Sequence, residues 1–409
     1  SRYSSTTTRD NTTLIDQNVT NTTSFDSLGN ALVQTQDKYV LDSSSNLVKV
    51  THRDITNSEY DARGDAGLQK ISTYLVDGAT STLVNYQEFT NRSFDVGHNV
   101  VNQMVLTYTD SAKATFLDCQ EIRSSSFTSS GVAQSQVVVT YSDAQKTGII
   151  DVKVISNSNI SSSGNVGTTV ITKYAGAAIS ADTSTITPSG NPIDRQTITN
   201  LSFDNRGNSL TQTVLRESYS SGAFAFSEAQ SISANKYDIH DRLTYSEVKN
   251  YSDASRTAFT DLQIVNYSSY DSFGNVLSQT IDTYSSATVI SGNLIDSKVI
   301  VNTYANALAA RRGNASTSTV SRYTSTATRD NTTLIDRSVT DTTSFDTLGN
   351  ALVQTQDKYV LDSTSAVVKV THRDITNSSY DTRGDAGVQK ISTYLVDGAT
   401  STLVNYQEF

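Results

Sequence analysis

Apolar and polar positions alternate along short stretches of the chain, and turn residues separate these stretches at regular intervals. Residues 275–284 alternate in this way, with Leu277 and Ile281 on the same face of an extended strand. A Ser-Gly-Asn reversal at 291–293 follows, and residues 294–303 predict a second strand. Alternation with a period of two, bounded by turn residues, is typical of β-strands. The pattern therefore predicts long β-hairpins, and only residues 305–312 resemble a short helix.

An aromatic residue followed by aspartate and a Gly-Asn-like turn recurs along the chain, as in Phe25-Asp26 with Gly29-Asn30. Consecutive anchors lie 33–35 residues apart, except at two places where the spacing is 43 and 41 residues. Fixed periods of 20–50 residues indicate stacked supersecondary units. The predicted unit anchors are Phe25, Tyr60, Phe94, Phe127, Ile160, Phe203, Tyr237, Tyr270, Tyr304, Phe345 and Tyr380.

A longer period contains the shorter one. Residues 321–409 match residues 1–89 at 77 of 89 positions, at a constant offset of 320 residues. We therefore interpret residues 1–320 as one large repeat made of nine units of about 35 residues, and residues 321–409 as the start of the next large repeat. Because Phe409 matches Phe89, we expect the natural polypeptide to continue with a sequence like that from Thr90 onward.

Two further columns of residues follow the anchors at fixed offsets, and we expect them to form structural ladders between units. Tyrosine stands fourteen residues after the anchor at Tyr39, Tyr74, Tyr108, Tyr141, Tyr174, Tyr251, Tyr284, Tyr359 and Tyr394. Glutamine stands nine residues after it at Gln34, Gln69, Gln103, Gln136, Gln212, Gln279, Gln354 and Gln389. A buried amide needs hydrogen-bond partners, which a column of glutamines can supply. We expect this column inside the stack, and Lys38, Thr73 and Thr107 outside it.

These periods predict an all-β chain, a tandem-repeat stack of long antiparallel β-hairpins in the form of a spiral or a ribbon. A parallel β-solenoid, in which each unit is one coil, is the alternative because it also places equal offsets in register.

The anchor, followed by leucine at Leu32, Leu210, Leu277 and Leu352, resembles the YD-repeat (Rhs-type) family and its giant bacterial surface proteins. The units here are longer than usual YD units, and asparagine stands where the family commonly has arginine after the glycine. The resemblance implies an antiparallel hairpin stack.

Composition narrows the class of protein further. Serine and threonine make up about 28% of the chain, which also holds 21 Tyr, two Pro and no Trp. The many β-branched and aromatic residues argue against disorder. A net charge of −10 without basic clusters argues against nucleic-acid binding, and we find no apolar stretch long enough to span a membrane. The single Cys119 excludes an intrachain disulfide.

Candidate chemistry is sparse. Arg63-Gly64-Asp65 is the integrin-binding tripeptide, but it falls on a unit turn, where such residues are usual. The turn aspartates, such as Asp26, lack the spacing of known calcium loops, and the histidines are too isolated for a metal pair. We predict no catalytic, cofactor or metal site and no enzymatic activity. Asn-x-Ser/Thr sequons recur, as at Asn11, and would carry glycans in a glycosylating source.

Regular units without a catalytic constellation favour a structural protein, an extracellular fibre or filament built from tandem β repeats. An adhesin stalk or surface-binding module is the first alternative, and a segment of an Rhs-like toxin-enclosing shell is the second. We expect an extracellular or cell-surface location. The expected partners are further copies of the chain itself, either covalently continued or end to end, together with glycans.

Overall fold

The computed structural model describes residues 1–4, 7–180, 185–381 and 384–409, which divide into two compact units. The first unit holds residues 1–229 and 237–242, and the second holds residues 230–236 and 243–409. The first unit contains β1 Arg2–Tyr3, β2 Leu14–Phe25, β3 Ala31–Leu41, β4 Leu47–Tyr60, β5 Ala66–Asp77, β6 Thr80–Phe94, β7 Val100–Tyr108, β8 Phe116–Phe127, β9 Ala133–Tyr141, β10 Ile149–Ile160, β11 Val166–Ile179, β12 Ile186–Phe203 and β13 Ser209–Ser220.

Strand β14 (Ala223–Tyr237) contributes residues to both units. The second unit contains β15 Leu243–Tyr251, β16 Phe259–Tyr270, β17 Val276–Tyr284, the short 3₁₀-helix η1 Ser291–Asn293, β18 Leu294–Thr303, α1 Ala307–Arg311, β19 Thr317–Tyr323, β20 Leu334–Phe345, β21 Ala351–Leu361, β22 Val367–Tyr380, β23 Ala386–Asp397 and β24 Thr400–Glu408.

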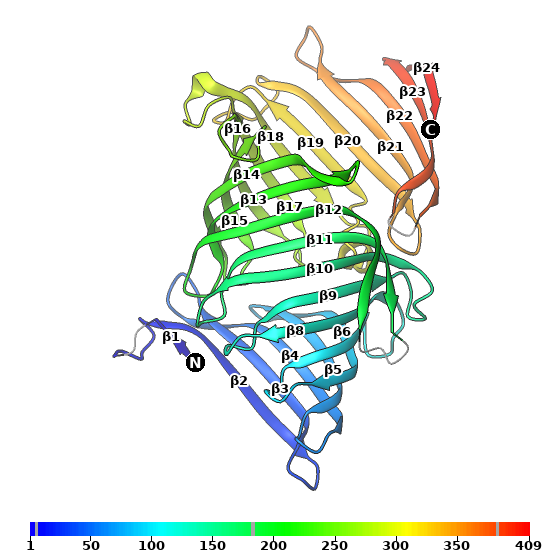
Figure 1. Ribbon diagram of the computed structural model, residues 1–409. Coiled ribbons are helices and arrows are strands. Elements are labelled where there is room, and N and C mark those ends of the chain that lie inside the picture. The colour runs from blue at the N-terminus through cyan, green and yellow to red at the C-terminus, as the bar shows by residue number, and fades with distance from the viewer. Residues whose placement is uncertain (5–6, 181–184, 382–383) are drawn as a thin grey trace. The chain divides into compact units, whose positions relative to one another are not determined.

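Within each unit, consecutive strands lie side by side and pair antiparallel, so the chain runs as a meander of hairpins (Figure 1). The predicted all-β stack of antiparallel hairpins is therefore confirmed. The parallel solenoid is wrong, because each strand that would begin a new coil pairs instead with its antiparallel neighbour.

The strand limits follow from the turn residues that the sequence supplies. The two strands expected at 275–284 and 294–303 correspond to β17 and β18, and the expected reversal is η1. The one expected short helix is α1, which begins after the side chain of Asn306 accepts a hydrogen bond from the N–H of Ala309. With only two prolines in the chain, nearly every backbone N–H is free to join a ladder.

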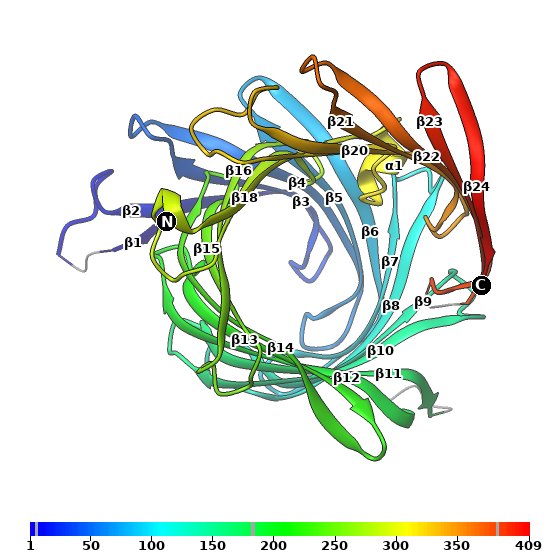
Figure 2. The same ribbon diagram turned by 90° about the horizontal axis from the view of Figure 1, so that it is seen from above.

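The sheet of the first unit is strongly curved (Figure 2). Its curvature brings the turn after β14 to β3, where Lys38 Nζ lies 2.9 Å from Asp241 Oδ2 although 203 residues separate them in sequence. The sheet of this unit therefore returns to itself after six hairpins.

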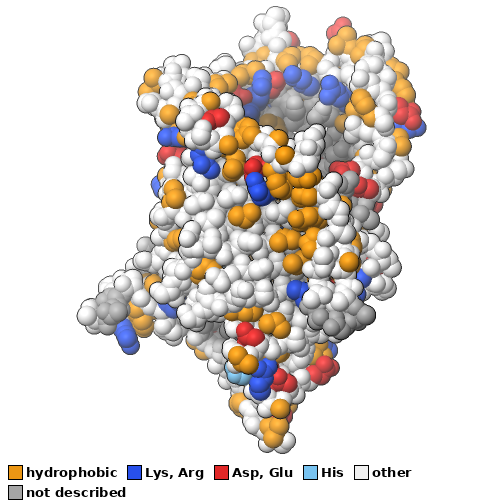
Figure 3. Space-filling model, viewed as in Figure 1, with side chains coloured by type: hydrophobic (Ala, Val, Ile, Leu, Met, Phe, Trp, Pro, Cys, Tyr) orange, Lys and Arg blue, Asp and Glu red, His pale blue; other side chains and the backbone are white. Residues whose placement is uncertain are grey.

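Few side chains are fully buried, and most strand residues remain partly accessible to solvent. The described residues hold one compact apolar cluster, made by Cys119, Val139, Tyr141, Val152 and Ile186. Ile186 reaches the cluster from the β11–β12 hairpin, and hydrophobic side chains gather over β10 to β12 on the face seen in Figure 3. The extra residues of the unit with the 43-residue spacing form this longer hairpin.

The residue before several anchors has a left-handed backbone conformation and faces a glycine on the next strand. Glu59 has a φ of 57°, and Gly67 stands opposite it in a register without a shift. A Cβ on Gly67 would stand 2.7 Å from the backbone oxygen of Glu59, and Gly167 and Gly387 meet Asn159 and Ser379 in the same way.

We expect Gly67→Ala to lower the free energy of unfolding by about 1–3 kcal/mol, because the backbone must shift to accept the methyl group. Gly292→Ala is the matched control, since a Cβ there meets nothing within 4 Å and the φ is not in the left-handed region. Urea unfolding of both variants measures the difference. Equal stability of the two variants would contradict the close approach.

Candidate functional site

The anchor aspartates close the turns at one edge of the sheet. Asp26 Oδ1 accepts hydrogen bonds from the backbone N–H groups of Leu28 and Asn30, at 2.9 and 2.8 Å. Asn30 Nδ2 donates to the other carboxylate oxygen at 2.9 Å, and these bonds lower the pKa of Asp26. Gly29 takes a φ of 88°, which favours glycine. The carboxylate is thus used as a turn cap.

The Arg-Gly-Asp tripeptide is engaged by the next turn along this edge. Arg63 Nη1 donates to the carbonyl of Asp95 at 2.6 Å, and Asp65 lies 2.8 Å from Nδ1 of His98. Both charged side chains therefore link neighbouring units. In the second copy, Arg383 lies outside the described residues.

The same edge holds a charged junction within the first unit. Asp241 accepts from Asn208 Nδ2 and pairs with Arg206 Nη1, both at 2.9 Å, in addition to Lys38. Burial raises the pKa of Asp241, but the hydrogen bonds of Asn208 and Lys38 and the two positive charges bring it below its usual value. This junction joins residues six hairpins apart.

The tyrosine column coincides with β-bulges. At eight of these tyrosines, the register of pairing with the following strand shifts by a bulge. These are Tyr39, Tyr74, Tyr108, Tyr174, Tyr251, Tyr284, Tyr359 and Tyr394. Tyr141 pairs with Ile149 beside a shift in β10. A bulge increases local twist and turns a side chain. These tyrosines therefore stand where the first strand of each hairpin bends.

The glutamines are half-buried and are linked through the strands between them. Gln34 Nε2 donates to Thr22 Oγ1 at 3.1 Å, while its Oε1 accepts from Asn57 Nδ2 at 3.1 Å. Gln69 Nε2 in turn donates to Asn57 Oδ1 at 2.9 Å. Equivalent bonds join Gln136 to Ser124, Gln354 to Thr342 and Gln389 to Asn377. The threonine, serine and asparagine side chains that bond to the glutamines were not identified from the sequence alone.

The expected outward position of Thr107 is wrong. Thr107, on the interior strand β7, is buried and only 8% exposed. Lys38 and Thr73 are partly exposed.

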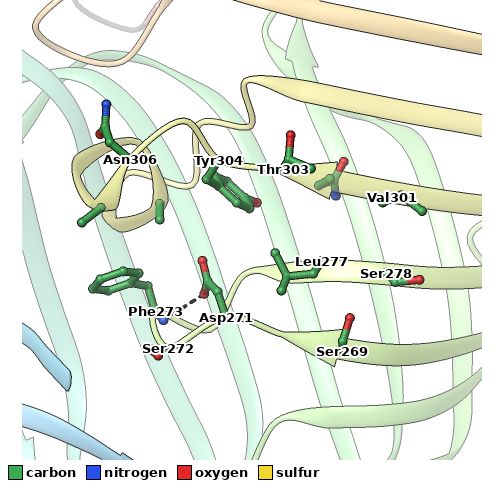
Figure 4. Close-up of a pocket in the computed structure, with 13 residues that line it drawn as sticks. Ser269, Asp271, Ser272, Phe273, Leu277, Ser278, Val301, Thr303, Tyr304 and Asn306 are labelled. Carbon is green, nitrogen blue, oxygen red and sulfur yellow. Dashed lines mark hydrogen bonds between the residues drawn. The ribbon is translucent and has the colours of Figure 1, made fainter. Parts of the chain in front are cut away.

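The unit of Tyr304, which has the 41-residue spacing, contains a pocket. In the unit of Tyr304, helix α1 stands where the other units have a short turn, and a pocket of about 520 Å³ opens beside it (Figure 4). Phe273, Leu277, Val301 and Tyr304 line it. Its polar groups are partly committed, since Asp271 accepts the N–H of Phe273 at 2.8 Å. The pocket therefore offers mainly an apolar surface.

A buried charged cluster lies on β8 and β9. Glu121 accepts a hydrogen bond from the Tyr141 hydroxyl at 2.7 Å and lies 3.2 Å from Lys146 Nζ. Burial raises the pKa of Glu121, but these partners hold it below its usual value. Burial also raises the pKa of Cys119 to about 11, so its thiol stays protonated at neutral pH.

Metal ligation finds no support among the described residues, in which no three His, Cys, Asp or Glu side chains form a group that could hold an ion. The histidines serve other contacts: Nδ1 of His52 lies 2.6 Å from Asp37, and its copy His372 lies 2.6 Å from Asp357. No helix in the described part of the chain has the length and apolarity to cross a membrane.

Comparison with known proteins finds similarity among solved structures. No family model matches the chain, and no curated protein matches it. The chain is similar to the crystal structure of TcdB2-TccC3 without its hypervariable C-terminal region, at 10% sequence identity and a TM-score of 0.18. The similarity covers 96% of this chain, which spans 27% of that chain.

We expect Asn57→Ala to lower the free energy of unfolding by about 1–3 kcal/mol, because it leaves Gln34 and Gln69 without a shared partner at an 8% exposed site. Asn21→Ala on the exposed side of β2 is the control and should change stability by less than about 0.5 kcal/mol. Urea unfolding separates the two. If Asn57→Ala lowers the free energy of unfolding no more than Asn21→Ala does, the glutamine ladder does not contribute to stability.

Acid should destabilise the fold. The carboxyl groups of Asp16, Glu121 and Asp241 have lowered pKa values, and hydrogen bonds from Ser255, Ala258 and Thr257 lower the pKa of Asp253 to about 2. The folded chain then binds fewer protons than the unfolded chain, so this stabilisation is present above about pH 4.5 and disappears towards about pH 2. Unfolding free energies across this range test it, with Asp241→Asn expected to flatten the slope.

Proposed function

We propose that the chain is a structural scaffold of stacked hairpin units, in which each strand pairs with the next strand along the stack. The single observation that carries this proposal is a strand sequence present twice, in two different surroundings. Residues 80–89 of β6 recur at 400–409, which include β24. Strand β6 pairs on one side with β5 and on the other with β7, whereas β24 pairs with β23 alone among the described strands.

The exposure of matching residues differs accordingly. Tyr86 is 7% exposed and its copy Tyr406 is 53% exposed. The side chain of Glu88 is 7% exposed and lies 2.7 Å from Lys113 Nζ, whereas that of Glu408 is 51% exposed. Where the sequence continues in the first copy, β7 covers these residues, so a strand like β7 is the natural neighbour of this strand sequence in a stack. The occupant that fits is a segment like β7 and the turn after it.

Such stacking fits a fibre or filament outside the cell or on its surface, with further copies of the chain as partners. The capped anchor turns support membership in the YD-repeat (Rhs-type) family, whose surface proteins motivate this location. Sequons at exposed sites such as Asn21 would add glycans to this surface.

A toxin-enclosing shell segment is the second candidate. The contact between Lys38 and Asp241 favours it, because a sheet that returns to itself after six hairpins can enclose a space. For the adhesin alternative, the Arg-Gly-Asp turn gives little support, since Arg63 and Asp65 are engaged by the neighbouring turn.

A peptide of residues 98–115 tests strand addition, because it contains β7 and Lys113. We expect saturable binding to the whole chain, measured by fluorescence anisotropy, and shielding of β24 amides from hydrogen exchange. Reversing the charge of the peptide at Lys113 should weaken binding at least about fivefold, since Lys113 pairs with Glu88 in the first copy and the reversed charge would repel Glu408 at the matching position.

The charge swap provides the matched control. Glu408→Lys should weaken the natural peptide and restore binding of the Lys113→Glu peptide. A scrambled peptide of the same composition should not bind. Absence of saturable binding, or indifference to both charge reversals, would overturn strand addition at this edge.

A further inference from the structure

The turn between β14 and β15 departs from the repeat at two neighbouring positions. Three residues after its anchor, His240 stands where the first anchor turn has Leu28, which is 85% exposed. One residue later, Asp241 takes a φ of 62°, whereas Gly29 and Gly274 occupy the same place in their turns. A left-handed backbone costs more for aspartate than for glycine. These two side chains therefore do more than reverse the chain.

Asp241 fastens this turn to residues that are distant in the sequence. Its carboxylate lies 2.9 Å from Lys38 Nζ on β3 and 2.9 Å from Arg206 Nη1, and it accepts a hydrogen bond from Asn208 Nδ2 at 2.9 Å. All these residues belong to the first unit, as does the whole turn at 237–242. Because the pKa of Asp241 is held below its usual value despite burial, the carboxylate stays charged in mildly acidic solution.

His240 lies next to this contact and is buried without a hydrogen-bond partner. Both ring nitrogens, Nδ1 and Nε2, are shielded from solvent, and neither has a partner in the part of the chain that the structure describes. Burial lowers the pKa of His240 from its ordinary value of 6.5, and the charge of Arg242 lowers it further. An imidazolium would place a full charge in a site that satisfies neither N–H. The docked turn therefore requires the neutral ring.

Three carboxylates near the ring do not offset its burial. Asp77 at the end of β5, together with Asp238 and Asp241 in the turn, favours the charged ring, yet the pKa of His240 stays lowered. None of the three accepts a hydrogen bond from the ring. Asp238 instead accepts from Arg242 Nε at 2.7 Å. Protonation would therefore leave the imidazolium without a direct partner.

The elements packed against the turn supply no spare anion. Lys38 faces it from β3, and Arg206 faces it from the turn at 204–208, where Asp204 lies 4.0 Å from Arg206 Nε. Arg2 on β1 pairs with Asp16 on β2, and the charges of this pair reach Asp241 and Lys38. These neighbouring elements thus hold one more cation than anion.

We propose that the turn at 238–242 is a pH-sensitive latch, which fastens to β3 while the His240 ring is neutral and leaves β3 once the ring is protonated. Because the contact with Lys38 is where the curved sheet of the first unit returns to itself, release of the latch opens that sheet.

The direction of the pH dependence follows from the two states of the turn. In the undocked turn the ring meets water, and its pKa returns to the ordinary value of about 6.5. The docked turn binds fewer protons below that pH. Its stabilisation is therefore complete above about pH 6.5 and is lost as the pH falls towards the lower pKa of the docked ring. Asp241 keeps its charge in this range, so the loss comes from the ring.

Carbodiimide coupling of Lys38 to Asp241 measures docking, because the reagent joins an amine to a carboxylate where the two are in contact. The whole chain is coupled at several pH values, and peptide mass spectrometry compares this cross-link with that between Lys153 and Asp151. The second pair lies 3.0 Å apart on β10 with similar exposure, and it corrects for the pH dependence of the reagent. We expect the ratio of the two cross-links to fall at least about threefold from about pH 7 to about pH 5, and to recover when the pH is restored before coupling.

His240→Phe removes the titrating group and keeps a buried ring, so its ratio should stay within about 1.5-fold over the same range. His98→Asn is the matched control, at an exposed histidine in another anchor turn, and should respond as the natural chain does. If His240→Phe does not fold, His240→Gln provides the same comparison with a neutral amide. A constant ratio in the natural chain, or an equal fall in the folded variant at position 240, would overturn the latch.

Discussion

Backbone hydrogen bonding between consecutive antiparallel strands is the interaction on which every other feature of this chain depends. The apolar cluster around Cys119 and Val139 is small, and most strand residues are partly accessible to water. Stability must therefore come largely from the ladder and from the polar side chains that follow it. The Gln34–Asn57–Gln69 series does this, because each amide completes the hydrogen bonds of the next. The scarcity of proline keeps the ladder continuous.

Units of regular and of longer spacing differ in how they use their polar side chains. The regular units use their charged residues on one another, as Arg63 and Asp65 do with the following turn. Two of the pockets involve the units with longer spacing, one beside α1 and one at the β11–β12 hairpin. A repeat that satisfies its own polar groups has few left to offer a ligand.

Much of the fold could be predicted from the sequence because turns and alternation are local. The limits of β17 and β18, the reversal between them and the short helix all follow from nearby residues. What could not be predicted depends on cross-strand register. The bulges at the tyrosine column and the Asn57 link between glutamines appear only once neighbouring strands are aligned. Thr107 was misplaced for this reason.

Register also explains how such a chain can grow without mispairing. A one-residue slip moves every side chain to the opposite face, yet alternation here is only weakly apolar against polar, so burial alone specifies register poorly. The bulge at each tyrosine and the close approach of Gly67 to Glu59 fix the pairing at both ends of the strands. Ion pairs such as the one between Glu88 and Lys113 also favour this register, because they need opposite charges to face each other. Each strand therefore selects its neighbour through backbone shape and charge together, which makes ordered stacking compatible with a low content of apolar residues.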